Sequence, residues 1–203
     1  MFRVLISMLF FLSYSTISQA QNFEGIIVYD QQNDKGNYAL IRYYFKDHNL
    51  RIEADFFNDG QIDRYTTIYR FNEYPNQRFE LGNNLFIAEN SSPDKAIKIE
   101  DQDAEINKHL GFDLKKYTKY YEHMFQGEIE TKTELQFHYS DKLIFELPPE
   151  CNSEPYMLSQ SKGKIALVMK VVSTNDLTEG YSYTRAARTI KEISLPDSLF
   201  EIR

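Results

Sequence analysis

The sequence contains very little cysteine, and Cys151 is its sole thiol. An intrachain disulfide is therefore excluded, so stability must come from side-chain burial and backbone hydrogen bonds. A lone thiol can act as a nucleophile, but no histidine lies near Cys151 in the sequence to serve as its base. We therefore interpret Cys151 as an ordinary half-buried side chain rather than a catalytic one.

Positive charge is also scarce. The chain has 23 lysines and arginines against 30 aspartates and glutamates, which gives a net charge of -7. A nucleic-acid-binding protein needs a concentrated positive field for the phosphates, and here the balance has the opposite sign. Nucleic acid is therefore not expected as a partner.

Long apolar runs are missing, apart from a short stretch at residues 4–12 that follows Arg3 and precedes small residues ending at Ala20. This stretch is much shorter than the roughly 20 residues that a membrane-spanning helix needs. A basic start, a short apolar core and small residues before a cleavage point are typical of a secretory signal peptide. We predict a signal peptide at residues 1–20. A single exported β-rich domain is predicted at residues 21–203, periplasmic or extracellular, soluble after cleavage and without a transmembrane anchor.

The usual signatures of catalysis are absent as well. No serine has the Gly-x-Ser-x-Gly surroundings of a hydrolase nucleophile, and neither a phosphate-binding loop nor a dinucleotide fingerprint occurs. The histidines, at positions 48, 109, 123 and 138, include no pair with the spacing of zinc ligands on a helix. We therefore predict that the protein is not an enzyme and that it uses no cofactor.

One acidic segment partly matches a calcium-binding loop. Asp55, Asp59 and Asp63 surround Gly60, and glycine permits the sharp turn that such a loop makes. However, Phe57 stands where an oxygen ligand is needed. A tight hairpin turn at Gly60 explains the same residues, so we predict no metal site and keep these aspartates only as a weaker alternative.

Aromatic residues, in contrast, are abundant, with 15 tyrosines and 15 phenylalanines but no tryptophan. Aromatic side chains favour the pleated surface of a sheet. Alternation of apolar and polar side chains predicts strands at residues 39–46, 133–139 and 165–172. Further strands are predicted at residues 23–29, 49–57, 61–71, 77–81, 85–88, 96–99 and 181–193.

Residues 103–125 carry two competing patterns, because their apolar residues fit a helical stripe while the aromatic run at 117–121 fits a strand. We predict a short helix or loop there, followed by a strand. The C-terminal tail is expected to dock through Leu199, Phe200 and Ile202. Many strands, short turns and very little helix predict a mainly β fold, in which a curled antiparallel sheet forms an incomplete barrel.

Three short segments give the chain a family likeness. They are FEGIIVY at residues 23–29, LGFDLKKY at 110–117 and SLFEI at 198–202. These segments resemble exported proteins of the GLPGLI type and related domains of unknown function. The resemblance implies a fold like that of the lipoprotein carriers LolA and LolB, in which a curled sheet surrounds an apolar cavity. It implies no catalytic residues.

An incomplete barrel has an inner apolar face that must be filled by side chains, by a helix or by a ligand. The leading hypothesis is therefore an exported binding module that shelters an apolar ligand or acyl chain. The candidate lining residues are Tyr43, Phe45, Leu135, Phe137, Leu167 and Met169. The same alternation also fits a solidly packed core. The alternative function is an envelope structural or interaction protein, which would bind a protein partner and no small molecule.

Overall fold

A computed structural model describes residues 22–88, 98–125, 128–148, 150–151, 158–161, 164–175 and 182–202. The predicted signal peptide lies outside these residues. The strands are β1 (Gly25–Asn33), β2 (Tyr38–Lys46), β3 (Asn49–Asn58), β4 (Gln61–Arg70), β5 (Gln77–Leu81), β6 (Leu85–Ala88), β7 (Lys98–His109), β8 (Phe112–Phe125), β9 (Glu128–Glu146), β10 (Leu158–Ser161), β11 (Lys164–Asn175) and β12 (Tyr183–Glu192). One turn of 3-10 helix, η1 (Asp197–Phe200), follows β12. The part of the chain that the structure describes contains no helix with the length and apolarity needed to cross a membrane.

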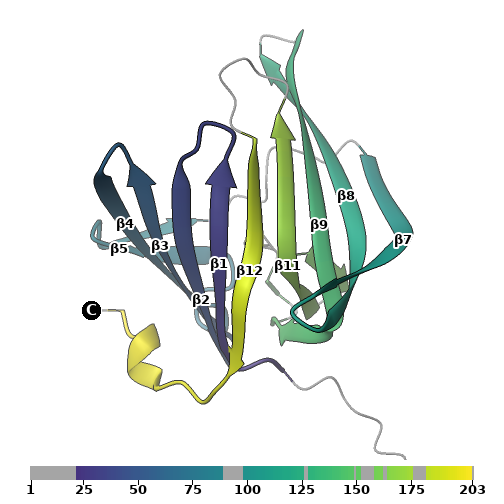
Figure 1. The fold of residues 1–203 in the computed structure, drawn as a ribbon. Helices are drawn as coiled ribbons and strands as arrows, with labels where there is room; N and C mark the ends of the chain where they lie inside the picture. The colour runs from purple at the N-terminus through teal and green to yellow at the C-terminus, as the bar shows by residue number, and fades with distance from the viewer. Residues whose placement is uncertain are drawn as a thin grey trace, which may run out of the picture.

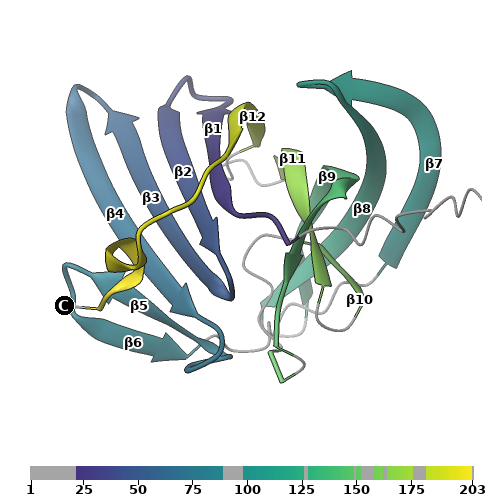
Figure 2. The ribbon, with the colours of Figure 1, turned by 90° about the horizontal axis from the view of Figure 1, so that it is seen from below.

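The strands form one 12-stranded sheet, shown in Figure 1. Its order is β6-β5-β4-β3-β2-β1-β12-β11-β9-β8-β7, with β10 paired to β11 off this path, and every pairing is antiparallel. The two ends of this order, β6 and β7, lie on opposite sides of the molecule in Figure 2. The sheet is therefore curled but not closed, which confirms the predicted fold class.

For strands β2 to β6, the observed bounds agree closely with those predicted from the sequence. The predicted hairpin turn between β3 and β4 is present, with Asp59 and Gly60 at φ of 47° and 82°. Two successive residues with positive φ are typical of the tight turns that match the twist of a hairpin. The turn chemistry alone therefore predicted this hairpin correctly.

The prediction of a short helix or loop within residues 103–125 is wrong. Strands β7 and β8 form a hairpin instead, turning at Leu110 and Gly111, whose φ angles are 49° and 84°. Gly111 adopts this conformation without strain, and the aromatic run at 117–121 pairs along β9. Strand β9 also continues through residues 140–142, which were predicted to end it, because an irregularity in its pairing with β11 accommodates the extra residues.

One face of the sheet is buried over much of its area, and we call it the inner face. It carries Ala39, Ile41, Tyr43 and Phe45 of β2, none more than 4% exposed. Cross-strand partners share a face, so the strand pairing identifies inner-face residues on the neighbouring strands as well. From β3 to β9, one row of such partners across the sheet is Phe56, Ala39, Gln31, Arg185, Val171 and Phe137.

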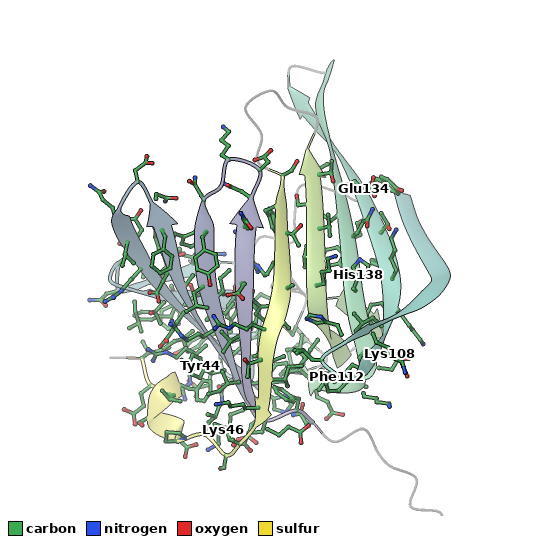
Figure 3. All side chains as sticks on the ribbon, viewed as in Figure 1. Tyr44, Lys46, Lys108, Phe112, Glu134 and His138 are labelled. Carbon is green, nitrogen blue, oxygen red and sulfur yellow. The ribbon has the colours of Figure 1, made fainter. Side chains whose placement is uncertain are left out.

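The opposite, outer face carries the C-terminal tail. Arg51 donates a hydrogen bond to the carbonyl oxygen of Leu199 at 2.9 Å, and Lys46 donates one to that of Leu195 at 2.6 Å. Lys46 lies beside η1 in Figure 3. Phe200 is 4% exposed. The tail therefore docks as predicted, on the outer face, and leaves the inner face to other contacts.

Aromatic side chains meet across the inner face and fill the interior of the curled sheet at one end. The ring of Phe145 lies 5.1 Å from that of Phe45 and 6.2 Å from that of Phe71, measured between centroids. Phe45 and Phe145 belong to β2 and β9, which are not neighbours in the sheet. Their contact therefore joins two facing parts of the same sheet at the lower end of β2 in Figure 1, which we call the closed end.

A second tie crosses the inner face where β11 separates from β12. These strands pair only from Tyr183 to Ala186 of β12. The hydroxyl of Tyr29 on β1 donates a hydrogen bond of 2.8 Å to the carbonyl oxygen of Val168, which lies between two register irregularities of β11. Burial raises the pKa of Tyr29 far above its ordinary value, so this hydroxyl keeps its proton. The bond thus replaces part of the strand pairing that is lost here.

Replacing Tyr29 by phenylalanine tests this tie, because the ring packing against Tyr43, at 5.0 Å between centroids, is retained. We expect Tyr29→Phe to lower the free energy of unfolding by about 1–3 kcal/mol, since it leaves a buried carbonyl without its donor. Tyr38→Phe is the matched control, because the Tyr38 hydroxyl binds the Asp30 carboxylate in a more accessible setting. Urea unfolding of both variants provides the measurement, and an equal, small loss in both would contradict the role of the tie.

Candidate functional site

Among the residues that the structure describes, two cavities open on the inner face towards the other end of the strands, which we call the open end. The larger has a volume of about 450 Å³, and its lining includes Gln31, Ala39 and Tyr183. The smaller has a volume of about 270 Å³, and its lining includes Tyr43 and Arg185. Phe56 lines both cavities, so they adjoin. We treat them as one feature, the inner groove.

Small side chains on two of the strands leave room for the groove. At the closed end, β2 and β3 contribute Phe45 and Leu50, both fully buried. Towards the open end, the same face carries Ala39 of β2 and Ala54 of β3. An alanine fills much less of the space over the sheet than a phenylalanine or leucine, so the interior that is packed at one end is hollow at the other.

Arg185 of β12 contributes a cation to the groove. Its Nη1 donates a hydrogen bond to the Tyr43 hydroxyl at 2.9 Å, and its Nε donates one to the Gln31 side-chain oxygen, also at 2.9 Å. The guanidinium also lies 5.9 Å from the centroid of the Tyr183 ring. Gln31 and Tyr183 line the larger cavity, whereas Tyr43 and Arg185 line the smaller. Arg185 is therefore oriented by residues of both cavities.

Strand β5 contributes an oppositely charged pair to the groove, Arg78 and Glu80, which both line the smaller cavity. The Arg78 Nε lies 3.2 Å from Glu80 Oε1, so the two side chains form an ion pair with each other. This pair adds polarity to the cavity wall, while its opposite charges largely offset each other.

The predicted lining residues occupy different settings. Tyr43 lines the smaller cavity and belongs to the core cluster as well. Phe45 and Leu167 are fully buried in that cluster, and neither lines either of the two cavities. The structure therefore brings one of these three residues to the groove and places the other two in packed core.

The remaining candidates lie on β9 and β11. Leu135 and Phe137 are on the inner face and pack in a second cluster that includes Tyr139 and Val168. Neither lines the two cavities described above. The side chain of Met169 lies outside the described residues. A ligand-lining role for Leu135, Phe137 and Met169 stays a prediction.

The aspartates of the calcium alternative are not brought together. Asp55 forms ion pairs with Arg42 at 2.9 Å and Arg64 at 3.4 Å. Asp63 pairs in register with Phe56, the residue next to Asp55, so the two aspartates point to opposite faces. Across the described ranges, no group of three histidine, cysteine, aspartate or glutamate side chains is placed to hold a metal ion.

His138 lies on β9 and is labelled in Figure 3. The register places Lys116 of β8 and Lys170 of β11 directly beside it. Burial first, and then the charges of Lys170 and Lys116, lower the pKa of His138. All of these influences favour the neutral imidazole in the folded protein.

This shift predicts a pH dependence of stability. Because the folded state resists protonation of His138, the unfolded chain binds more protons there, and stability should fall as the pH drops below about 6.5. His138→Gln removes the group, so the loss of unfolding free energy between about pH 7 and pH 5 should become smaller. Urea unfolding at both pH values measures this change. The NMR titration of the wild-type His138 ring provides a direct check, and a midpoint above the ordinary value of about 6.5 would contradict the prediction.

Comparisons with known proteins add little to this description. No protein-family model matches the chain, and no curated protein matches its sequence. Among solved structures, the chain is similar to a LolA superfamily protein from Nitrosomonas europaea, with a TM-score of 0.29 and 12% identity over 90% of this chain and 91% of that one. The fold assignment rests on strand order and register rather than on this similarity. Membership of the GLPGLI-type family stays a prediction.

Proposed function

We propose that the protein is an exported binding protein, periplasmic or extracellular, that shelters an apolar ligand or acyl chain in the inner groove and catalyses no reaction. The observation that carries this proposal is that the inner face is packed at the closed end and hollow at the open end. The larger cavity, at about 450 Å³, falls within the roughly 300–1,000 Å³ that is usual for small-molecule sites.

The wall of the groove favours an apolar ligand. Ile41, Ile52, Ala54 and Phe56 line the smaller cavity from two adjacent strands. Apolar surface in an open groove is in contact with water, and a ligand that covers it gains roughly 25 cal/mol for each Å² removed from water. The polar residues around these side chains are suited to fixing the orientation of a ligand rather than to reacting with it.

A substitution that fills the groove tests this proposal. Thr67 lines the smaller cavity from β4, and Thr67→Phe places a larger side chain there. We expect the wild-type protein to bind the uncharged fluorescent probe phenylnaphthylamine saturably, and the variant to bind it about tenfold more weakly, because overlap with the side chain costs binding free energy. Fluorescence titration measures both affinities.

The matched control is Thr184→Phe, because Thr184 is exposed and pairs with Val172 and Gln32, on the face opposite to Arg185. This variant should bind the probe as the wild type does. Thermal unfolding of all three proteins verifies that they are folded. The absence of saturable binding to the wild type, or equal weakening by both substitutions, would rule out the groove as the binding site.

Exposed apolar side chains favour the second candidate function, an envelope protein that binds a protein partner. Ile62 and Tyr65 of β4 are 49% and 60% exposed, and Leu85 and Phe86 of β6 are 57% and 44% exposed. Strand β6 ends the path of the sheet, and an edge strand offers unpaired backbone groups to a partner. A partner-binding function without a ligand predicts that the probe titration shows no saturable binding.

A further inference from the structure

We propose that the ligand of the inner groove carries an uncharged head group with several hydroxyl groups, as in the sugar of a glycolipid, and that side-chain amides at the open end bind this head. This inference rests on the proposed function and names the head group that the proposed acyl chain carries. Its structural basis is a set of three asparagines that line the larger cavity, Asn33, Asn37 and Asn58, which we call the amide rim.

The amide rim is formed by the turns at the open end of the sheet. Asn33 is the last residue of β1, Asn37 directly precedes β2, and Asn58 is the last residue of β3. The β1–β2 and β3–β4 turns lie together at the upper end of the strands in Figure 1. Gln31, two residues before Asn33 on the same strand, lines the larger cavity as well. The wall of this cavity therefore contains four carboxamide groups from three neighbouring strands and the turn between two of them.

The turn between β1 and β2 holds one of these amides in place. The Asn33 Oδ1 atom accepts hydrogen bonds from the backbone N–H groups of Lys35, at 3.1 Å, and Asn37, at 2.7 Å. Such bonds are typical of an asparagine that stabilises a turn. Across the described ranges, no hydrogen bond engages the side-chain amide of Asn37 or Asn58. These two amides can therefore both donate and accept hydrogen bonds when a ligand enters the cavity.

The chemistry of this wall favours an uncharged head group with hydroxyls. A hydroxyl group, like a carboxamide, both donates and accepts hydrogen bonds, so the two can pair in either direction. A charged head would lose its hydration on entering and would need an opposite charge beside it. The described lining of the larger cavity contains no charged side chain. The aromatic rings of Tyr38, Phe56 and Tyr183 also line it, and they offer flat apolar surface to the faces of a sugar ring.

The inner face becomes apolar immediately below the amide rim. Alternate residues of a strand share a face, and inwards from Asn58 those of β3 are Phe56, Ala54 and Ile52. Phe56 lines both cavities, and Ala54 and Ile52 line the smaller one. A ligand whose head lies at the amide rim thus has apolar surface within reach of its adjoining alkyl chain. This change of polarity along one strand fits a ligand with a polar, uncharged end and an extended apolar end.

A comparison of ligands with the same alkyl chain and different heads tests the inference. Decyl glucoside carries several hydroxyl groups, whereas the decyl ether of tetraethylene glycol is equally uncharged but carries mainly ether oxygens. Both are titrated against the phenylnaphthylamine complex below their micellar concentrations. We expect the wild-type protein to bind the glucoside at least about tenfold more tightly, because ether oxygens accept hydrogen bonds but cannot donate them to the amide oxygens.

Methyl glucoside, which has the same head and no long chain, separates a glycolipid from a free sugar. We expect it to displace the probe at least about a hundredfold more weakly than decyl glucoside, because burial of the chain supplies most of the binding free energy. Equal displacement by the two glucosides would overturn the assignment to a glycolipid.

Two variants assign the preference to the amide rim. Asn58→Leu removes one amide with little change in side-chain size, so the preference for decyl glucoside over the polyether should fall about fivefold, while affinity for the polyether stays within about twofold of wild type. Gln32→Leu is the matched control, because Gln32 is exposed and follows Gln31 in β1, which places it on the opposite face. This control should keep the full preference. Thermal unfolding verifies the fold of each variant.

The outcomes separate this inference from the proposed function. Equal binding of decyl glucoside and the polyether by the wild type overturns the inference while leaving apolar binding in the groove intact, and this comparison requires no variant. An unchanged preference in Asn58→Leu, or an equal loss in Gln32→Leu, overturns the assignment to the amide rim. Failure of both decyl ligands to displace a probe that has bound saturably also overturns the inference. If the probe does not bind either, the proposed function itself fails.

Discussion

The contact between Phe45 of β2 and Phe145 of β9 is the constraint on which the shape of the molecule depends. In the strand order, β1, β12 and β11 separate these two strands. Their rings can meet at 5.1 Å only if the sheet bends back over its own inner face. Phe71, which directly follows β4, joins the same contact, so the closed end is fixed by aromatic packing between two strands and the turn after a third. The hollow open end follows from this arrangement, because a sheet that curls around one packed end encloses space wherever its side chains are smaller.

Packing and binding are therefore separated along the length of the same strands. Phe45 and Ala39 belong to one strand and one face, yet the first fills the core and the second leaves room for a cavity. Substitutions at the closed end should act mainly on stability, since they remove well-packed contacts. Those at the open end should act mainly on ligand binding, because the side chains there line the cavities. Tyr29→Phe thus tests a tie across the interior, whereas Thr67→Phe tests the groove.

The sequence predicted the local elements well and their spatial relations poorly. Alternation identified β2, and turn residues such as Asp59 and Gly60 identified the hairpins from β3 to β6, because both signals depend on near neighbours in the chain. Alternation shows which face a residue occupies but not how far along the barrel it lies. Phe45 and Tyr43 therefore looked equivalent as lining candidates, although only Tyr43 reaches the groove. Arg185 was missed because a charged residue in a strand is usually interpreted as solvent-facing. The sequence did contain one indication, because Arg185 is two residues from Ala187 on the same strand and so shares the inner face with it.

Tyr43 explains how a charge can be placed next to an aromatic core. Its ring packs 5.0 Å from Tyr29 and 6.1 Å from Phe45, while its hydroxyl accepts a hydrogen bond from Arg185. The same side chain is thus apolar towards the closed end and polar towards the groove. A phenylalanine at this position would maintain the packing but leave the guanidinium with one fewer partner holding it. The amphipathic character of tyrosine, rather than its size alone, therefore allows the packed end and the cationic groove to lie side by side within one curled sheet.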